Sequence, residues 1–108
     1  MSNWAICFYI DVPCLFQRVV SYEKESSQVV TVFYRGEFFK VPMDKMREIN
    51  PPKFAYGDTV SPANHLELTG VITDIVYHGG REEPMHFIEI NGKRKSKRYF
   101  EDDLVRRL

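Results

Sequence analysis

Short apolar segments alternate with polar, glycine- or proline-containing breaks along the whole chain, and this pattern predicts strands rather than helices. Within several segments the apolar and polar positions alternate, which is typical of strands with one face in a core. In the first half the candidate strands are residues 4–10, 15–22, 28–34, 37–41 and 46–49. In the second half a turn runs into a strand at residues 54–60, a long strand lies within 66–77, and a hairpin and short strand occupy 85–108.

The hairpin is the most strongly signalled element. Its Asn91-Gly92 pair predicts a two-residue type I′ turn, because that turn needs positive φ at both positions. A turn of this length sets the facing pairs as Ile90 with Lys93, Glu89 with Arg94 and Ile88 with Lys95. The return strand has no large apolar residue before Tyr99, so we expect most of it at a sheet edge or on a solvated face.

A proline-rich segment divides the chain. Asn50-Pro51-Pro52-Lys53 is stiff and extended, so we predict domains at residues 1–50 and 54–108 joined by a linker at 51–53. Residues 34–49 and 91–108 share an order of features: a glycine turn, a returning strand, a polar corner of one helical turn and a short strand. This indicates a tandem repeat. Because about 55 residues is near the lower limit for an independent core, we expect the halves to pack together.

The repeated ending resembles that of small SH3-like barrels, in which a hairpin is followed by a 3-10 turn and a short closing strand. Residues 98–108 look like this ending, and residues 40–49 look like it more loosely. The start of the second half, Gly57-Asp58-Thr59-Val60 with Gly70-Val71-Ile72, is similar to the pattern of KOW and Tudor-like barrels. The resemblance implies an all-β protein of two small SH3-like barrels packed in tandem, each closed by a 3-10 turn and a short strand. Such barrels bind RNA, DNA, peptides or proteins, so the fold leaves the ligand open.

Composition and charge change this picture little. A chain of 108 residues with 44% hydrophobic residues suits an ordinary folded protein, and its eight Phe and six Tyr favour strands. Fifteen basic and fifteen acidic residues cancel, so no overall field draws the molecule to nucleic acid or to an anionic membrane. Attraction of a charged partner must therefore come from a local charged patch.

The cysteines and the apolar N-terminal run favour a cytoplasmic protein. Cys7 and Cys14 have six residues between them and match neither a CxxC motif nor a zinc knuckle, so we interpret them as reduced, buried thiols. The run at residues 4–16 contains Asp11 and Pro13, is too short to span a bilayer and lacks the features of a signal peptide. We expect a core strand there and no association with a membrane.

The densest local charge is in the predicted hairpin. Its basic residues are Lys93, Arg94, Lys95, Lys97 and Arg98, with Phe87 and Tyr99 on the neighbouring strands. One interpretation is a phosphate-tracking hairpin with aromatic rings for base stacking. The other is a solvated edge strand whose charge is neutralised by Glu89, Glu101, Asp102 and Asp103.

The sequence offers little for catalysis or metal binding. His65, His78 and His86 match no short zinc motif, and no phosphate loop is present. If His65 and His78 lie on loops at the same barrel end, they could rim a ligand pocket. We therefore expect a binding module without enzymatic activity, cofactor or metal. Its predicted ligand is a protein or peptide, with exposed aromatic residues and the basic hairpin as the binding surface; the alternative is RNA or DNA bound by the hairpin at 93–98.

Overall fold

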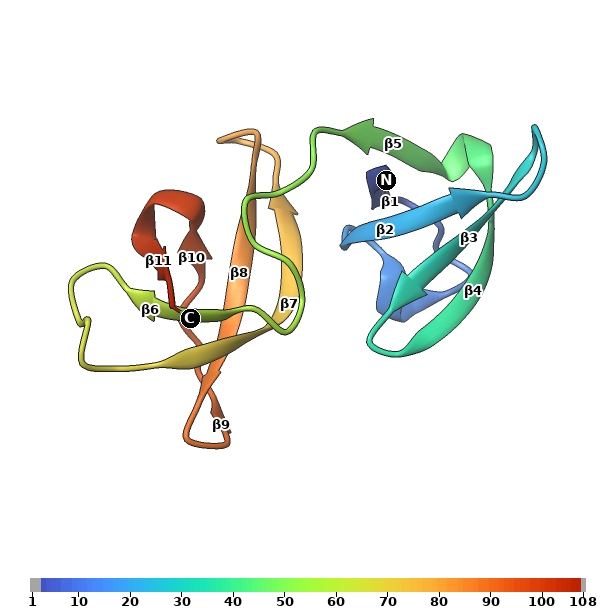
Figure 1. Ribbon diagram of the computed structural model, residues 1–108. Coiled ribbons are helices and arrows are strands. Elements are labelled where there is room, and N and C mark those ends of the chain that lie inside the picture. The colour runs from blue at the N-terminus through green and yellow to red at the C-terminus, as the bar shows by residue number, and fades with distance from the viewer. Residues whose placement is uncertain (1–2, 108) are drawn as a thin grey trace. The chain divides into compact units, whose positions relative to one another are not determined.

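The computed structural model describes residues 3–107, which form an all-β structure of two antiparallel sheets without an α-helix (Figure 1). The chain divides into a first unit, Met1–Pro51, and a second unit, Pro52–Leu108. Met1, Ser2 and Leu108, at the ends of the two predicted domains, lie outside the described residues.

The first unit contains a five-stranded sheet in the order β4-β3-β2-β1-β5. Its strands are β1 (Asn3–Cys7), β2 (Val19–Lys24), β3 (Val29–Tyr34), β4 (Glu37–Pro42) and β5 (Met46–Ile49). In β3 buried and half-buried residues alternate, as expected of a strand with one face in the core. The buried apolar side chains of this unit are Ala5, Ile6, Cys7, Leu15, Val19, Val20, Tyr22, Val30, Val32, Tyr34 and Val41.

The β3–β4 hairpin confirms the glycine turn predicted at the start of residues 34–49, where Arg35 and Gly36 both have positive φ. The corner after it is also confirmed, because a 3-10 turn at Met43–Lys45 leads directly into β5. The strand predicted at residues 15–22 begins later. Pro13–Leu15 forms a 3-10 turn and Gln17 has a φ of 64°, so extended pairing starts only at Val19.

The second unit contains a six-stranded sheet, with the order β10-β8-β7-β6-β11 and β9 also paired to β8. Its strands are β6 (Thr59–Pro62), β7 (Gly70–His78), β8 (Glu83–Ile90), β9 (Lys93–Arg94), β10 (Tyr99–Phe100) and β11 (Leu104–Arg106). A 3-10 turn at Glu101–Asp103 precedes β11, so the predicted order of features at the end of the chain is confirmed. The core comprises Phe54, Val60, Ile72, Ile75, Ile88, Ile90, Tyr99 and Leu104, together with the polar Ser61, Asp74 and His86.

The predicted hairpin has the predicted register. Asn91 and Gly92 have φ of 53° and 77°, Glu89 faces Arg94, and Ile90 faces Lys93. The amide N–H of Lys95 donates to the carbonyl oxygen of Ile88 at 2.9 Å, in agreement with the third predicted pair. Strand pairing then stops until Tyr99, which faces His86.

A β-bulge interrupts the regular alternation of faces along β7, the long strand predicted within residues 66–77. The register shifts between Ile72, which faces Ile88, and Asp74, which faces Phe87. The extra residue places Ile72 and Ile75 in the core, although strict alternation puts them on opposite faces. Asp74 consequently shares a face of the sheet with Phe87.

The two sheets repeat one strand order. In each, the first strand lies between the second and the last, and the last strand follows a 3-10 turn. Neither sheet is closed by pairing between its edge strands among residues 3–107, so the structure shows two open antiparallel sheets where closed barrels were predicted.

Candidate functional site

The basic hairpin projects from one end of the second unit (Figure 1). All of its basic residues are exposed: Lys93, Arg94, Lys95, Lys97 and Arg98. Because β9 has only two residues and β10 starts at Tyr99, three of these side chains lie on a segment outside the strand ladder.

Phe87 lies beneath two of the cations. The guanidinium carbons of Arg94 and Arg98 are 4.9 Å and 5.7 Å from the centre of its ring. Cations at these distances are attracted by the face of an aromatic ring. The half-buried Phe87 therefore brings Arg94 and Arg98 together, although they are four positions apart in the sequence.

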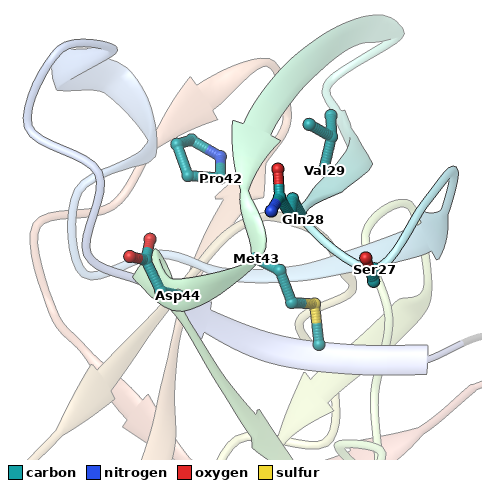
Figure 2. A pocket seen from close by; sticks show the side chains of 6 residues that line it. All are labelled: Ser27, Gln28, Val29, Pro42, Met43 and Asp44. Carbon is teal, nitrogen blue, oxygen red and sulfur yellow. The ribbon is translucent and has the colours of Figure 1, made fainter.

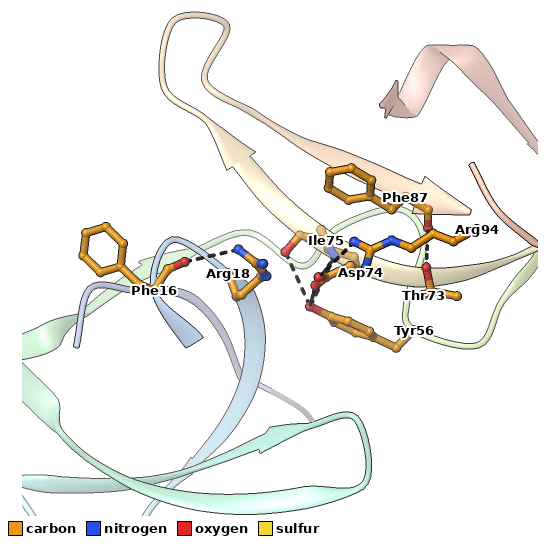
Figure 3. Close-up of polar contacts among 8 residues, drawn as sticks. All are labelled: Phe16, Arg18, Tyr56, Thr73, Asp74, Ile75, Phe87 and Arg94. Carbon is orange, nitrogen blue, oxygen red and sulfur yellow. Dashed lines mark hydrogen bonds and ion pairs between the residues drawn. The ribbon is translucent and has the colours of Figure 1, made fainter. Parts of the chain in front are cut away.

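Asp74, on β7, anchors Arg94 from the other side of β8 (Figure 3). Its side chain is 2% exposed, and its Oδ2 lies 3.7 Å from Nη2 of Arg94. The Tyr56 hydroxyl donates to Oδ1 of Asp74 at 3.3 Å, and the Ile75 N–H donates to the same oxygen at 3.0 Å. A carboxylate buried to this extent requires such partners, because burial without them is costly.

Two of the acidic residues expected to neutralise the hairpin bind backbone groups. Asp103 accepts a hydrogen bond from the Phe100 N–H at 2.9 Å and so caps the 3-10 turn, while Glu101 accepts one from the Lys53 N–H. Within residues 3–107 no carboxylate forms an ion pair with any of four cations: Lys93, Lys95, Lys97 and Arg98. Acidic side chains in the described part of the chain therefore neutralise little of the positive charge of the hairpin.

The second predicted aromatic residue has a different environment. Tyr99 is buried, with 8% of its surface exposed, and the ammonium nitrogen of Lys97 lies 5.1 Å from its ring centre. Most of the ring therefore belongs to the core, and little of it is open to a stacked base.

The histidines do not come together. His65 is on the exposed loop before β7, where its Nδ1 is 3.2 Å from Oε1 of Glu67, whereas His78 ends β7. His65 precedes β7 and His78 is the last residue of this nine-residue strand, so the two histidines belong to different elements. His86 is fully buried in β8.

Sequence reasoning missed the residues that hold the cations in place. Asp74 and Tyr56 belong to the site because the bulge turns Asp74 toward Phe87, and a bulge has no reliable signature in a single sequence. A second cation–aromatic pair was missed at the β7–β8 turn, where the Arg81 guanidinium lies 3.8 Å from the Phe100 ring centre. Gly79 and Gly80 before Arg81 are typical of a loop, but they do not indicate the contact with Phe100.

The first unit has a shallow pocket of about 510 Å³ between the β2–β3 loop and the end of β4 (Figure 2). Its lining is Ser27, Gln28, Val29, Pro42, Met43 and Asp44. The Met43 N–H donates to the Gln28 carbonyl at 2.8 Å, which fixes the two walls relative to each other. The lining has one charged side chain, so this pocket offers less electrostatic recognition than the hairpin.

The cysteines differ in environment. Cys7 is buried, and burial raises the pKa of its thiol, whereas Cys14 is exposed, contrary to the expectation that both are buried. The described residues contain no group of three or more His, Cys, Asp or Glu side chains placed to hold a metal ion. They also include no helix long and apolar enough to cross a membrane.

Comparison with known proteins gives one match. The profile of a family of unknown function, DUF6960, matches residues 12–105. No curated protein and no solved structure matches the chain.

Proposed function

We propose a binding function without catalysis for this chain, which belongs to the DUF6960 family of unknown function. Its ligand is an acidic segment of a protein partner, recognised by the basic hairpin of the second unit. The observation that carries this proposal is the exposed cluster of Lys93, Lys95, Lys97 and Arg98, none of which forms an ion pair within residues 3–107. Like charges held on one short hairpin repel one another, and an anionic partner relieves that repulsion.

A protein is a better ligand for this surface than a nucleic acid. Binding to single strands combines cations with open aromatic faces for the bases. Here the Phe87 ring carries two guanidinium groups and Tyr99 is mostly buried, so neither ring offers a free stacking face. The zero net charge of the chain also provides none of the long-range attraction typical of nucleic-acid-binding domains.

We also propose that each unit is an SH3-like barrel and that the pair forms a tandem binding module in the cytoplasm. The support for the fold is the strand order that the two sheets share, with a 3-10 turn before the last strand of each. The support for the compartment is that Cys7 and Cys14 are free thiols.

The proposal can be tested by titrating the isotopically labelled full chain with a short glutamate-rich peptide and, separately, with a single-stranded oligonucleotide. We expect the peptide to shift the amide signals of residues 93–98 at low salt. Lys95→Glu with Lys97→Glu should weaken that binding by about tenfold or more, because two attractions become repulsions.

Lys24→Glu with Lys45→Glu is the matched control, since both lysines are exposed in the first unit and the change in net charge is the same. This control should bind the peptide as the parent does. If the oligonucleotide shifts the hairpin signals and the peptide does not, nucleic acid is the ligand. If neither ligand shifts them, the hairpin is not a binding surface for anions and the proposal is rejected.

A further inference from the structure

The geometry points to a defined carboxylate site within the hairpin, formed by Arg94 and Arg98 on the ring of Phe87, with Asp74 as the residue that positions Arg94. This inference rests on the proposed binding of an acidic protein segment. It names the chemical group that the surface selects, and it distinguishes the two arginines from the three lysines beside them.

Arg94 and Arg98 share one support. Their guanidinium carbons are 4.9 Å and 5.7 Å from the centre of the same Phe87 ring, so both groups lie next to one side chain. The N–H groups at the edge of a guanidinium match the two oxygens of a carboxylate. Both arginines are exposed, so a ligand can reach them.

Asp74 restricts the movement of Arg94. The carboxylate is itself fixed by the Tyr56 hydroxyl at 3.3 Å and by the Ile75 N–H at 3.0 Å, and it holds Arg94 Nη2 at 3.7 Å (Figure 3). The β-bulge in β7 is what places Asp74 opposite Phe87 on the neighbouring strand. A side chain oriented before binding loses less conformational entropy when the ligand arrives, so this anchor favours affinity.

Two carboxylates beside Arg94 offset part of the stronger attraction that a phosphate group has to the hairpin cations. Asp74 lies beside Arg94 on one side, and Glu89 faces it across the β8–β9 pair. A phosphate monoester carries a charge of about −1.5 to −2 and is repelled by these two carboxylates more strongly than a singly charged carboxylate is. The site therefore suits glutamate or aspartate side chains of the partner.

Lysines on the same hairpin have a different role. Lys93 and Lys95 have no aromatic support among the described residues, and Lys97 lies over the buried Tyr99. Their charges attract an anion without fixing its orientation, because an ammonium group is a point charge on a flexible stem. Replacing Arg94 or Arg98 by lysine therefore keeps the positive charge and removes the paired N–H donors.

The test compares charge-conserving variants of the full chain by titration with the glutamate-rich peptide. We expect Arg98→Lys and Arg94→Lys each to lower the affinity by about tenfold, since the paired N–H donors are lost while the charge remains. Arg35→Lys and Arg107→Lys replace exposed arginines outside the hairpin and are the matched controls, so they should leave the affinity within about twofold. The salt dependence should stay the same in all four variants, because the number of charges does not change.

Two more measurements separate this site from general attraction. Asp74→Asn should weaken peptide binding and broaden the side-chain N–H signal of Arg94. If Asp74→Asn unfolds the protein, the arginine variants remain informative, because their side chains are exposed and do not contribute to the core. Replacing one glutamate of the peptide by phosphoserine should not raise the affinity. If phosphoserine binds more than about tenfold tighter through both arginines, the ligand group is a phosphate and the assignment to carboxylate is wrong.

If Arg94→Lys and Arg98→Lys bind as well as the controls while Lys95→Glu with Lys97→Glu still weakens binding, the defined site does not exist and the proposed function stands. If no variant and no parent protein binds the peptide, the proposed function fails and this inference fails with it.

Discussion

His86 is fully buried in β8, and its surroundings favour the neutral ring. Its Nδ1 lies 3.0 Å from the carbonyl oxygen of Tyr99, which only accepts hydrogen bonds, so Nδ1 carries the proton. Its Nε2 is buried and has no hydrogen-bond partner in residues 3–107. Burial lowers the pKa of His86, and the weaker effects of the Tyr99 carbonyl, Glu101 and Glu83 oppose that shift.

This predicts that the second unit loses stability in mild acid. The pKa of His86 is lower in the folded chain than in the unfolded chain, where it is about 6.5. Between the two values the unfolded state binds more protons, so the free energy of unfolding decreases as the pH falls below about 6.5 and levels off below the folded-state pKa. Urea unfolding across a pH series, followed by amide signals of the second unit, measures this slope.

The control for His86 is His65, which is exposed on a loop. His86→Gln should flatten the pH dependence between neutral and mildly acidic conditions, whereas His65→Gln should leave it as in the parent. A parent chain whose unfolding free energy is constant over this range would contradict the assignment of a buried neutral histidine.

At the scale of elements, the last strand, β11, is short, and the side chain of Arg106 adds to its backbone pairing with β6. Arg106 donates through Nη1 to Oδ2 of Asp58 at 2.9 Å and through Nη2 to the Lys53 carbonyl at 2.6 Å. Its guanidinium carbon also lies 5.3 Å from the ring centre of Phe54. These contacts fasten a strand of three residues to the segment that begins the second unit.

Arg106→Gln should therefore destabilise the second unit by about 1 kcal/mol, a modest value because the pair is partly exposed to water. Arg107→Gln is the neighbouring control. The Arg107 side chain is exposed, and its bond to the Thr59 carbonyl uses the backbone N–H, which glutamine keeps. Equal unfolding midpoints for the two variants in urea would show that Arg106 does not hold the strand.

Elements with a local cause were predictable from the sequence, and those with a nonlocal cause were not. Asn91-Gly92 and Arg35-Gly36 form their turns because these residues accept positive φ. The bulge that places Asp74 opposite Phe87 has no comparable local signal, since it depends on how β7 pairs with β8. For the same reason the basic residues of the hairpin could be found, whereas their partners Tyr56 and Asp74 could not.

At the scale of the whole molecule, equal numbers of acidic and basic residues mean that long-range charge contributes little to stability. The ion pairs Lys40–Glu25, Arg81–Glu83 and Arg106–Asp58 are partly exposed, and such pairs contribute little in water. The hairpin is different because its cations are gathered in one place.

Added salt should accordingly weaken peptide binding much more than it changes the stability of the fold. Raising sodium chloride from low concentration to about 0.5 M should change the free energy of unfolding by less than about 1 kcal/mol, while affinity for the glutamate-rich peptide should fall by more than about tenfold. Chemical denaturation and peptide titration over the same salt series measure both. A peptide affinity that does not depend on salt would contradict recognition by the hairpin charges.

The sequence by itself determined the all-β class, the turns, the 3-10 corners and the register of the last hairpin, because each depends on residues close together in the chain. The tertiary structure decided which cations share the Phe87 ring, that Tyr99 belongs to the core, and that Asp74 reaches Arg94. These features depend on pairing between β7, β8 and β9 and on a one-residue shift within it. A shift of one residue moves a side chain to the other face of a sheet, and no local pattern encodes it.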